Sequence, residues 1–218
     1  MSKFIELYRP YNDYLIQELG LDWYELRKTS EENGNGPGIY PDSAACFVKF
    51  AKADEVNTVL ELGSGASTIF LSTICKQLNK TFLSIEESFY WRSVTESLLS
   101  KYELDQRINL MEGFDFSSIS RPDLLFIDSD PKGRRHILQD ICNDSWQSDQ
   151  IPIILLDDAE DIHYTIPVVE TLSKFNRFNN WFFNPVHRQD RSLLVNHKDN
   201  SFNLSEWFWE WKPDKVYW

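Results

Sequence analysis

The feature that most constrains the fold is a glycine-rich turn between an apolar run and a helix pattern. Residues 58–62 have the composition of a buried strand, and residues 67–77 have that of the helix that follows it. Gly63 and Gly65 lie between these segments and allow the backbone to turn sharply and to approach a ligand at the helix N-terminus. Glu61 places a carboxylate at the carboxyl end of the strand, where open α/β sheets bind ligands. The turn therefore predicts a ligand site at one edge of an α/β sheet.

Strand and helix patterns alternate along the chain, which predicts a mostly parallel sheet with helices on both faces. The expected helices span about 3–30, 41–53, 67–77, 89–102, 134–142 and 165–175. The expected strands span 58–62, 81–85, 108–111, 124–127, 151–156, 181–184 and 192–196, and the last two form an antiparallel hairpin. The predicted parts are a helical cap with a breaker-rich loop (1–42), a central domain (43–198) and an aromatic-rich tail (199–218).

Length, charge and cysteine usage exclude several classes of protein. A chain of 218 residues suits one α/β domain, and its net charge of −12 argues against nucleic acid as a partner. The longest apolar run, residues 151–156, is too short to span a bilayer, and the N-terminus lacks the apolar region of a signal peptide. The three cysteines are widely spaced, which favours reduced thiols in the cytoplasm. We therefore expect a cytoplasmic protein whose partner is a small molecule, without nucleic acid or membrane.

The glycine turn resembles motif I of the class I S-adenosylmethionine-dependent methyltransferases, whose pattern is acidic-x-Gly-x-Gly-x-Gly. Here the motif is Glu61-Leu62-Gly63-Ser64-Gly65-Ala66-Ser67, so Ser67 replaces the third glycine and offers a hydroxyl as helix N-cap. A nicotinamide-binding fingerprint would need glycine where Thr68 stands. The resemblance covers residues 43–198 and implies a Rossmann-like seven-stranded sheet with a closing hairpin, and S-adenosylmethionine as cofactor. It assigns cofactor binding in the turn to Glu61, Gly63, Ser64, Gly65, Ser67 and Thr68.

Two further turns extend this interpretation. The strand at 81–85 is followed by Glu86 and Glu87, about 20 residues after the glycine turn, where a carboxylate can accept from a ribose diol. Glu86 is the better candidate because the family's acidic residue closes the strand; the alternative is that both residues only cap the next helix. The turn at 112–115 is similar to the family's turn beside the adenine. There Phe114 would cover the ring or Asp115 would accept from its amine, unless this is a plain surface turn.

Acidic residues follow the next two strands. Asp128 and Asp130 come after the strand at 124–127, and Asp157 and Asp158 after the strand at 151–156. Like charges at neighbouring strand ends raise one another's pKa unless a cation or a substrate amine joins them, and Mg²⁺ is one solution. The pattern looks like that of the catechol and caffeoyl-coenzyme A O-methyltransferases, which makes Asp128, Asp157 and Asp158 the metal ligands. Asp158 stands where that family has asparagine, so a metal-free crevice is the other interpretation.

A basic patch at 132–136 follows these acids. It is either a solvated first helical turn or a contact for an anionic group on the substrate. His136 and His163 are candidate general bases, since histidine titrates near neutral pH; the alternative for each is a structural role. The candidate catalytic residues are Asp128, Asp130, Lys132 and His136, and Asp128 is also a candidate for cofactor binding.

The C-terminal tail places Trp207, Trp209 and Trp211 on one face of an extended segment. Such a stripe packs on the domain, forms a homodimer contact or walls a substrate pocket. We favour packing on the core or at a subunit contact.

The sequence as a whole predicts an S-adenosylmethionine-dependent methyltransferase that acts on a small molecule at oxygen. The choice of oxygen rests on the resemblance alone. Two alternatives stay open at this point: a nucleoside-cofactor-binding module without activity, and an aminopropyl-type transferase whose acidic crevice binds a polyamine.

Overall fold

The structure is a computed structural model that describes residues 3–34, 38–112, 116–128, 153–158, 179–183 and 193–197. The chain divides into two compact units, residues 1–124 and 125–218. Helices alternate with parallel strands in the first unit, which confirms the expected α/β fold.

The first unit contains five α-helices within its described residues. They are α1 (Lys3–Leu19), α2 (Trp23–Glu32), α3 (Pro41–Ala51), α4 (Ala66–Gln77) and α5 (Phe89–Lys101). The single helical region expected at 3–30 is two helices, because Gly20 adopts φ 70° and Asp22 begins a new helix. The Oδ1 atom of Asp22 accepts from the backbone N–H of Tyr24 at 2.8 Å, which satisfies a free donor of the first turn. Pro10 lies inside α1 without ending it.

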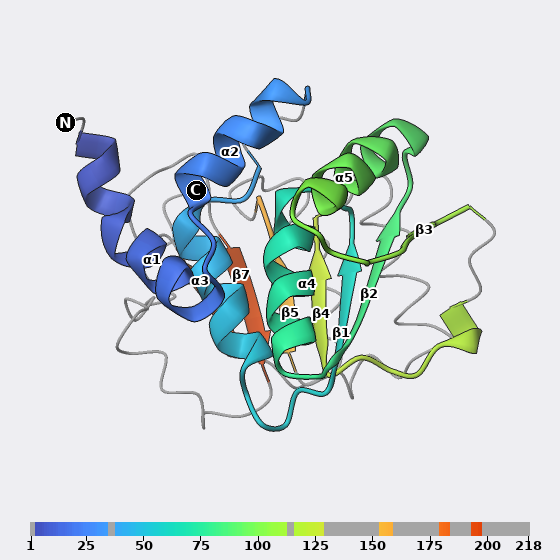
Figure 1. The fold of residues 1–218 in the computed structure, drawn as a ribbon. Coiled ribbons are helices and arrows are strands. Elements are labelled where there is room, and N and C mark those ends of the chain that lie inside the picture. The colour runs from blue at the N-terminus through green and yellow to red at the C-terminus, as the bar shows by residue number, and fades with distance from the viewer. Residues whose placement is uncertain are drawn as a thin grey trace. The chain divides into compact units, whose positions relative to one another are not determined.

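Three parallel strands form the sheet of the first unit: β1 (Thr58–Leu62), β2 (Thr81–Glu86) and β3 (Ile108–Leu110). The central strand is β2. Its Ser84 is the register partner of Glu61 in β1, and its Glu86 is the register partner of Leu110 in β3. Helix α4 lies beside this sheet in Figure 1 and contacts both β1 and β2. The side chains of Leu60, Leu62, Ile69 and Phe70 are buried and form part of this core. Burial of the sheet and of one helix face therefore holds the glycine turn between β1 and α4 in place.

The second unit contains four described strands, of which β4 (Leu124–Ile127) begins at the last residue of the first unit. Strand β5 (Ile153–Leu156) pairs antiparallel with β7 (Leu193–His197), and β7 pairs antiparallel with β6 (Asn179–Phe183). The side chains of β4 and β5 are buried, as expected from their continuous apolar sequence.

Several sequence-based expectations fall outside the described residues. These are the helices at 134–142 and 165–175, the connection between β6 and β7, and the aromatic tail. The coverage of both sheet faces, the hairpin and the boundaries at 42/43 and 198/199 therefore stay predictions. None of the described helices is both long and apolar enough to cross a membrane.

Candidate functional site

The glycine turn joins the carboxyl end of β1 to the first residue of α4. Gly63 adopts φ 92°, a left-handed conformation that favours glycine, and its N–H donates to the carbonyl of Ile85 at 2.8 Å. Gly65 is the residue before the helix. A Cβ atom built on Gly65 would meet no other atom within 4 Å, so open space lies in front of this backbone. The turn therefore offers a cradle beside a helix N-terminus, as nucleotide-binding α/β proteins do.

Glu61 is fully buried beneath this turn and is bonded within the protein. Its Oε1 accepts from Ser67 Oγ at 2.6 Å, and its Oε2 accepts from Thr68 Oγ1 and Ser84 Oγ, each at 2.7 Å. Burial raises the pKa of the Glu61 carboxyl from 4.5 to about 7, while the three hydroxyl donors oppose the rise and the charge of Glu86 adds to it.

The hydroxyls of Ser67 and Thr68 connect the turn to this buried carboxylate. The expectation that the Ser67 hydroxyl caps α4 is wrong, because the helix begins at Ala66 and this hydroxyl donates to Glu61 instead. Thr68 Oγ1 accepts from the N–H of Gly65 at 2.9 Å and donates to Glu61. Glu61, Ser67 and Thr68 thus fix the conformation of the turn. Their predicted contact with a cofactor stays a prediction.

Glu86 closes β2, as the sequence predicts, and its carboxylate reaches back to the glycine turn. Its Oε2 accepts from the backbone N–H of Ser64 at 2.7 Å and from Ser64 Oγ at 2.9 Å, and its Oε1 accepts from the N–H of Ser88 at 2.8 Å. The cap of α5 is the Ser88 side chain, which accepts from the N–H of Trp91. Glu86 is only 4 % exposed, so a carboxylate that is held in place lies between the turn and the start of α5.

Gly34 and Gly38 lie close to the helices that begin at this end of the first unit. A Cβ atom on Gly38 would lie 2.9 Å from the Cβ of Ala66, and one on Gly34 would lie 3.1 Å from the hydroxyl oxygen of Tyr90. Gly38 is therefore close to the first turn of α4, and Gly34 is close to a side chain of the first turn of α5.

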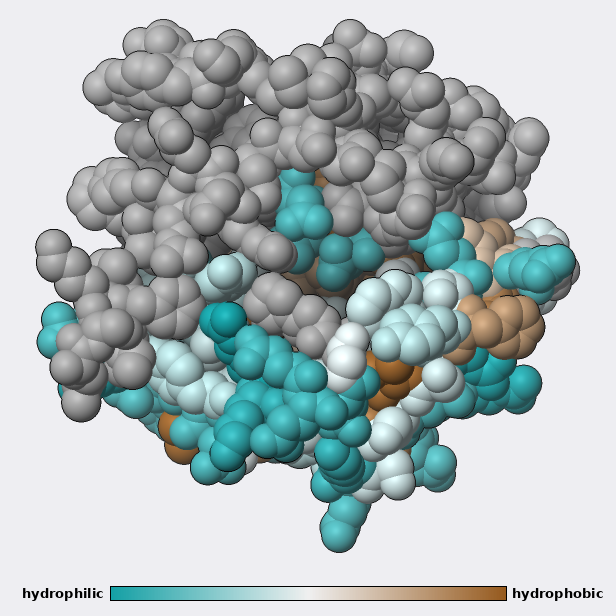
Figure 2. All heavy atoms as spheres, turned by 90° about the horizontal axis from the view of Figure 1, so that it is seen from above, coloured by the Kyte–Doolittle hydropathy of each residue, from teal (hydrophilic) through white to brown (hydrophobic). Residues whose placement is uncertain are grey.

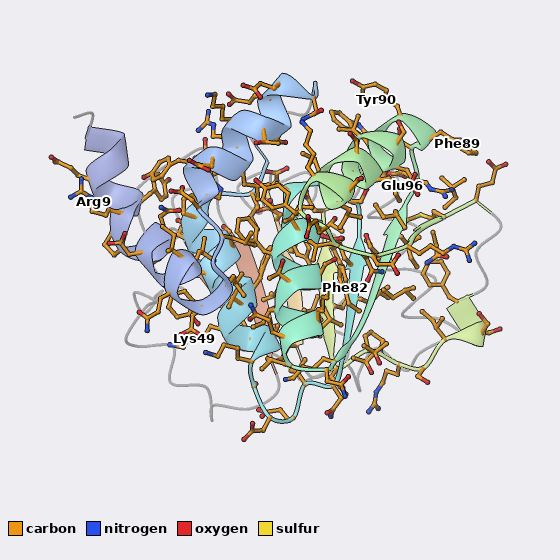
Figure 3. All side chains as sticks on the ribbon, in the orientation of Figure 1. Arg9, Lys49, Phe82, Phe89, Tyr90 and Glu96 are labelled. Carbon is orange, nitrogen blue, oxygen red and sulfur yellow. The ribbon has the colours of Figure 1, made fainter. Side chains whose placement is uncertain are left out.

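Exposed aromatic side chains lie at the first turn of α5. Phe89, Tyr90 and Trp91 are all exposed, and Figure 3 shows Phe89 projecting outward from the helix. Figure 2 looks onto the molecule from above and shows hydrophobic and hydrophilic side chains side by side on its coloured surface. These aromatic residues follow the Glu86 turn directly in the sequence.

Apart from Asp128, the remaining residues predicted for the cofactor and catalytic sites are Glu87 and several that lie outside the described residues. Glu87 is half-buried after the end of β2. Phe114, Asp115, Asp130, Lys132 and His136 lie outside the described residues, so their roles stay predictions.

The acidic residues Asp128, Asp157 and Asp158 belong to the second unit. The N–H of Asp157 donates to the carbonyl of Ile127 at 3.1 Å, which joins the ends of β4 and β5. Asp157 is buried, and Asp158 adopts φ 52°, a left-handed conformation that aspartate tolerates. In the part of the chain that the structure describes, no group of three or more His, Cys, Asp or Glu side chains is placed to hold a metal ion. The magnesium site stays a prediction.

Two polar residues of the site were not predicted from the sequence. Ser84 faces Glu61 from the neighbouring strand, and the hydroxyl of Ser64 lies 3.1 Å from Oγ1 of Thr95, which is in α5. Ser84 carried a usable signal, because it is a polar residue inside an apolar strand, two positions before Glu86 and on the same face. Thr95 carried none, since its position depends on how α5 packs.

Comparison with solved structures shows what this fold is similar to. The chain is similar to the cofactor-bound protein Rv0187 from MTB, with 16% identity, a TM-score of 0.60, and coverage of 81% of this chain and 89% of that one. It is also similar to an O-methyltransferase from Bacillus cereus in complex with SAH, with 17% identity, a TM-score of 0.56, and coverage of 86% and 96%. A third similar structure is the SAH-bound methyltransferase PaMTH1 from Podospora anserina, with 18% identity, a TM-score of 0.54, and coverage of 86% and 88%.

These similarities show the fold. The chain has the α/β fold found in two methyltransferases that were solved with SAH bound and in the cofactor-bound protein Rv0187. No protein-family model matches the sequence. A search of the curated proteins finds no match either.

Proposed function

We propose that this protein is an S-adenosylmethionine-dependent methyltransferase that acts on a small molecule at an oxygen atom. The observation that supports it best is the buried carboxylate of Glu86, which lies against the glycine turn in a fold shared with methyltransferases. The turn fits such a cofactor, because Gly65 leaves open space where a side chain would block the approach.

We assign the cofactor to residues of the first unit. The carboxylate of Glu86 accepts hydrogen bonds from the two hydroxyl groups of the ribose. The turn from Gly63 to Gly65 lets the cofactor approach the N-terminus of α4. Glu61 supports the turn from beneath. The sulfonium of the bound cofactor supplies an activated methyl group, so the protein needs to contribute mainly proximity and alignment.

We assign the acceptor to the acidic residues of the second unit and the basic patch that follows β4. Asp128 and Asp130 would orient the acceptor, Lys132 would meet an anionic group on it, and His136 would take its proton. We propose that these acidic residues work without a metal ion, since Asp158 stands where the catechol and caffeoyl-coenzyme A O-methyltransferases have an asparagine ligand.

Further proposals concern the assembly and its setting. We propose that the protein forms the seven-stranded sheet expected from its sequence, closed by an antiparallel hairpin of the last two strands. The aromatic tail would pack on this domain or form a homodimer. The buried free thiols of Cys46 and Cys75 support a reducing compartment, and we propose the cytoplasm.

Calorimetric titration with S-adenosylhomocysteine tests the cofactor before any acceptor is known. We expect saturable binding to one site, and conversion of S-adenosylmethionine to S-adenosylhomocysteine when a panel of hydroxylated acceptors is supplied. Binding without turnover on any acceptor would favour a non-catalytic module. Saturable binding of spermidine would favour an aminopropyl-type transferase.

A further inference from the structure

The hydroxyl of Ser64 occupies a position on Glu86 that a diol ligand needs. A carboxylate offers about four lone-pair positions. Three are used within the described residues, by the N–H of Ser64, the hydroxyl of Ser64 and the N–H of Ser88. A ribose diol brings two O–H donors, so the carboxylate is one acceptor short while Ser64 donates to it.

Ser64 has a second acceptor within reach. Its Oγ lies 2.9 Å from Oε2 of Glu86 and 3.1 Å from Oγ1 of Thr95. Thr95 is fully buried and gives its own hydrogen to the carbonyl of Trp91 at 3.0 Å, so its lone pairs can accept from Ser64. The single hydrogen of Ser64 can therefore turn from Glu86 to Thr95 by rotation about the Cβ–Oγ bond.

We infer that Ser64 and Thr95 form a hydroxyl switch that prepares Glu86 for a diol ligand. Without ligand, Ser64 donates to Glu86 and keeps this nearly buried carboxylate satisfied. When a ribose hydroxyl donates to Oε2, the hydrogen of Ser64 turns to Thr95, and every polar group remains paired. The backbone N–H of Ser64 stays on Glu86 in both states. This inference rests on the proposed binding of ribose at Glu86.

The switch makes an unusual prediction for two variants. Ser64→Ala removes a competing donor and leaves a lone pair of Glu86 without its partner, so diol ligands should bind more tightly, by at least about threefold. Thr95→Val removes the second acceptor, so diol ligands should bind about threefold more weakly, because Ser64 then loses its partner when they bind. In the double variant, Thr95→Val should have no further effect on affinity, since the Ser64→Ala background has no hydroxyl hydrogen to redirect.

The experiment compares full-length wild-type protein, both single variants and the double variant. Binding of S-adenosylhomocysteine is measured by calorimetry, and binding of adenosine and 2′,3′-dideoxyadenosine by ligand-observed NMR. Ser93→Ala is the matched control for Thr95→Val, because Ser93 also donates to a carbonyl of the preceding turn, that of Tyr90, at 2.8 Å. The control should leave all affinities unchanged.

Two results together support the switch. Ser64→Ala binds adenosine and S-adenosylhomocysteine more tightly than the wild type does, but not the dideoxy nucleoside. Thr95→Val lowers the affinity in the wild-type background and not in the Ser64→Ala background. An unchanged or weaker affinity in Ser64→Ala, or an equal loss from Thr95→Val in both backgrounds, overturns it. If S-adenosylhomocysteine does not bind but adenosine follows the predicted pattern, the proposed methyltransferase function fails and the switch remains. If neither ligand binds, both are wrong.

Discussion

Glu61 and Ser84 are register partners on the neighbouring strands β1 and β2, and the hydroxyl of Ser84 donates to Oε2 of Glu61 at 2.7 Å. The carboxylate of Glu61 also accepts from the hydroxyls of Ser67 and Thr68, and these hydrogen bonds fix the conformation of the glycine turn. The acidic residue of the glycine motif therefore has a structural role, whereas Glu86 at the end of β2 lies beside the turn itself.

Substitution Glu61→Gln should change how stability depends on pH. The pKa of Glu61 rises from 4.5 to about 7 on folding, so the protonated form favours the folded state. The protonated carboxyl contributes about 3 kcal/mol to the free energy of unfolding. This contribution is fully present below pH 4.5 and is lost as the pH rises to about 7. Urea unfolding at pH 5 and pH 8 should show that loss in the wild type, and Glu61→Gln should lack it. An equal pH dependence in both proteins would contradict the pKa assignment.

Substitution Glu86→Ala should weaken the binding of S-adenosylhomocysteine by about 1.5–3 kcal/mol, the scale of hydrogen bonds to a charged group. Calorimetry measures the change, and circular dichroism checks that the variant is folded. Glu96→Ala is the control, because Glu96 is an acidic residue on α5 whose carboxylate pairs with Arg92. Unchanged affinity in a folded Glu86→Ala variant would remove Glu86 from the cofactor site.

Substitution Gly38→Ala should destabilise the protein more than Gly20→Ala. Both glycines have positive φ, of 60° and 70°, so both variants have the cost of the left-handed conformation, about 1 kcal/mol. Only Gly38 adds a close contact, because its new Cβ would lie 2.9 Å from Ala66. We expect an additional loss of about 1 kcal/mol in the free energy of unfolding, measured in urea. Equal losses would mean that the segment before α3 does not lie against α4.

Substitution Ser72→Ala should raise the free energy of unfolding by about 1 kcal/mol. The hydroxyl of Ser72 in α4 is buried and has no hydrogen-bond partner among the residues that the structure describes. Ser97→Ala, at an exposed position of α5, measures the gain from helix propensity alone and should be smaller. If both variants gain equally, the Ser72 hydroxyl has a partner in solution.

A chelator should leave methyl transfer unchanged if the crevice works without metal, and Asp157→Asn should then alter KM or kcat without any metal dependence. Activity assays with and without chelator and added Mg²⁺ make the comparison. Loss of activity with chelator and its recovery with Mg²⁺ would instead support ligation by Asp128, Asp157 and Asp158.

The sequence by itself determined most of the local structure of the first unit and the position of the glycine turn at the carboxyl end of β1. Apolar runs and helix patterns predicted β1 with its observed bounds and α4 and β2 to within one residue, because buried strands and amphipathic helices have periods that can be read directly. Glu86 was found because the end of a strand is a local property.

Only the tertiary structure decided what each polar side chain does. In the structure, the hydroxyls of Ser67, Thr68 and Ser84 all donate to Glu61, and the strand register is what brings Ser84 there. The packing of α5 places Thr95 beside Ser64. Such pairings join residues 6 to 31 positions apart, and they follow from how strands align and helices pack. A sequence pattern gives the type and spacing of polar groups, but burial and long-range packing decide which donor meets which acceptor.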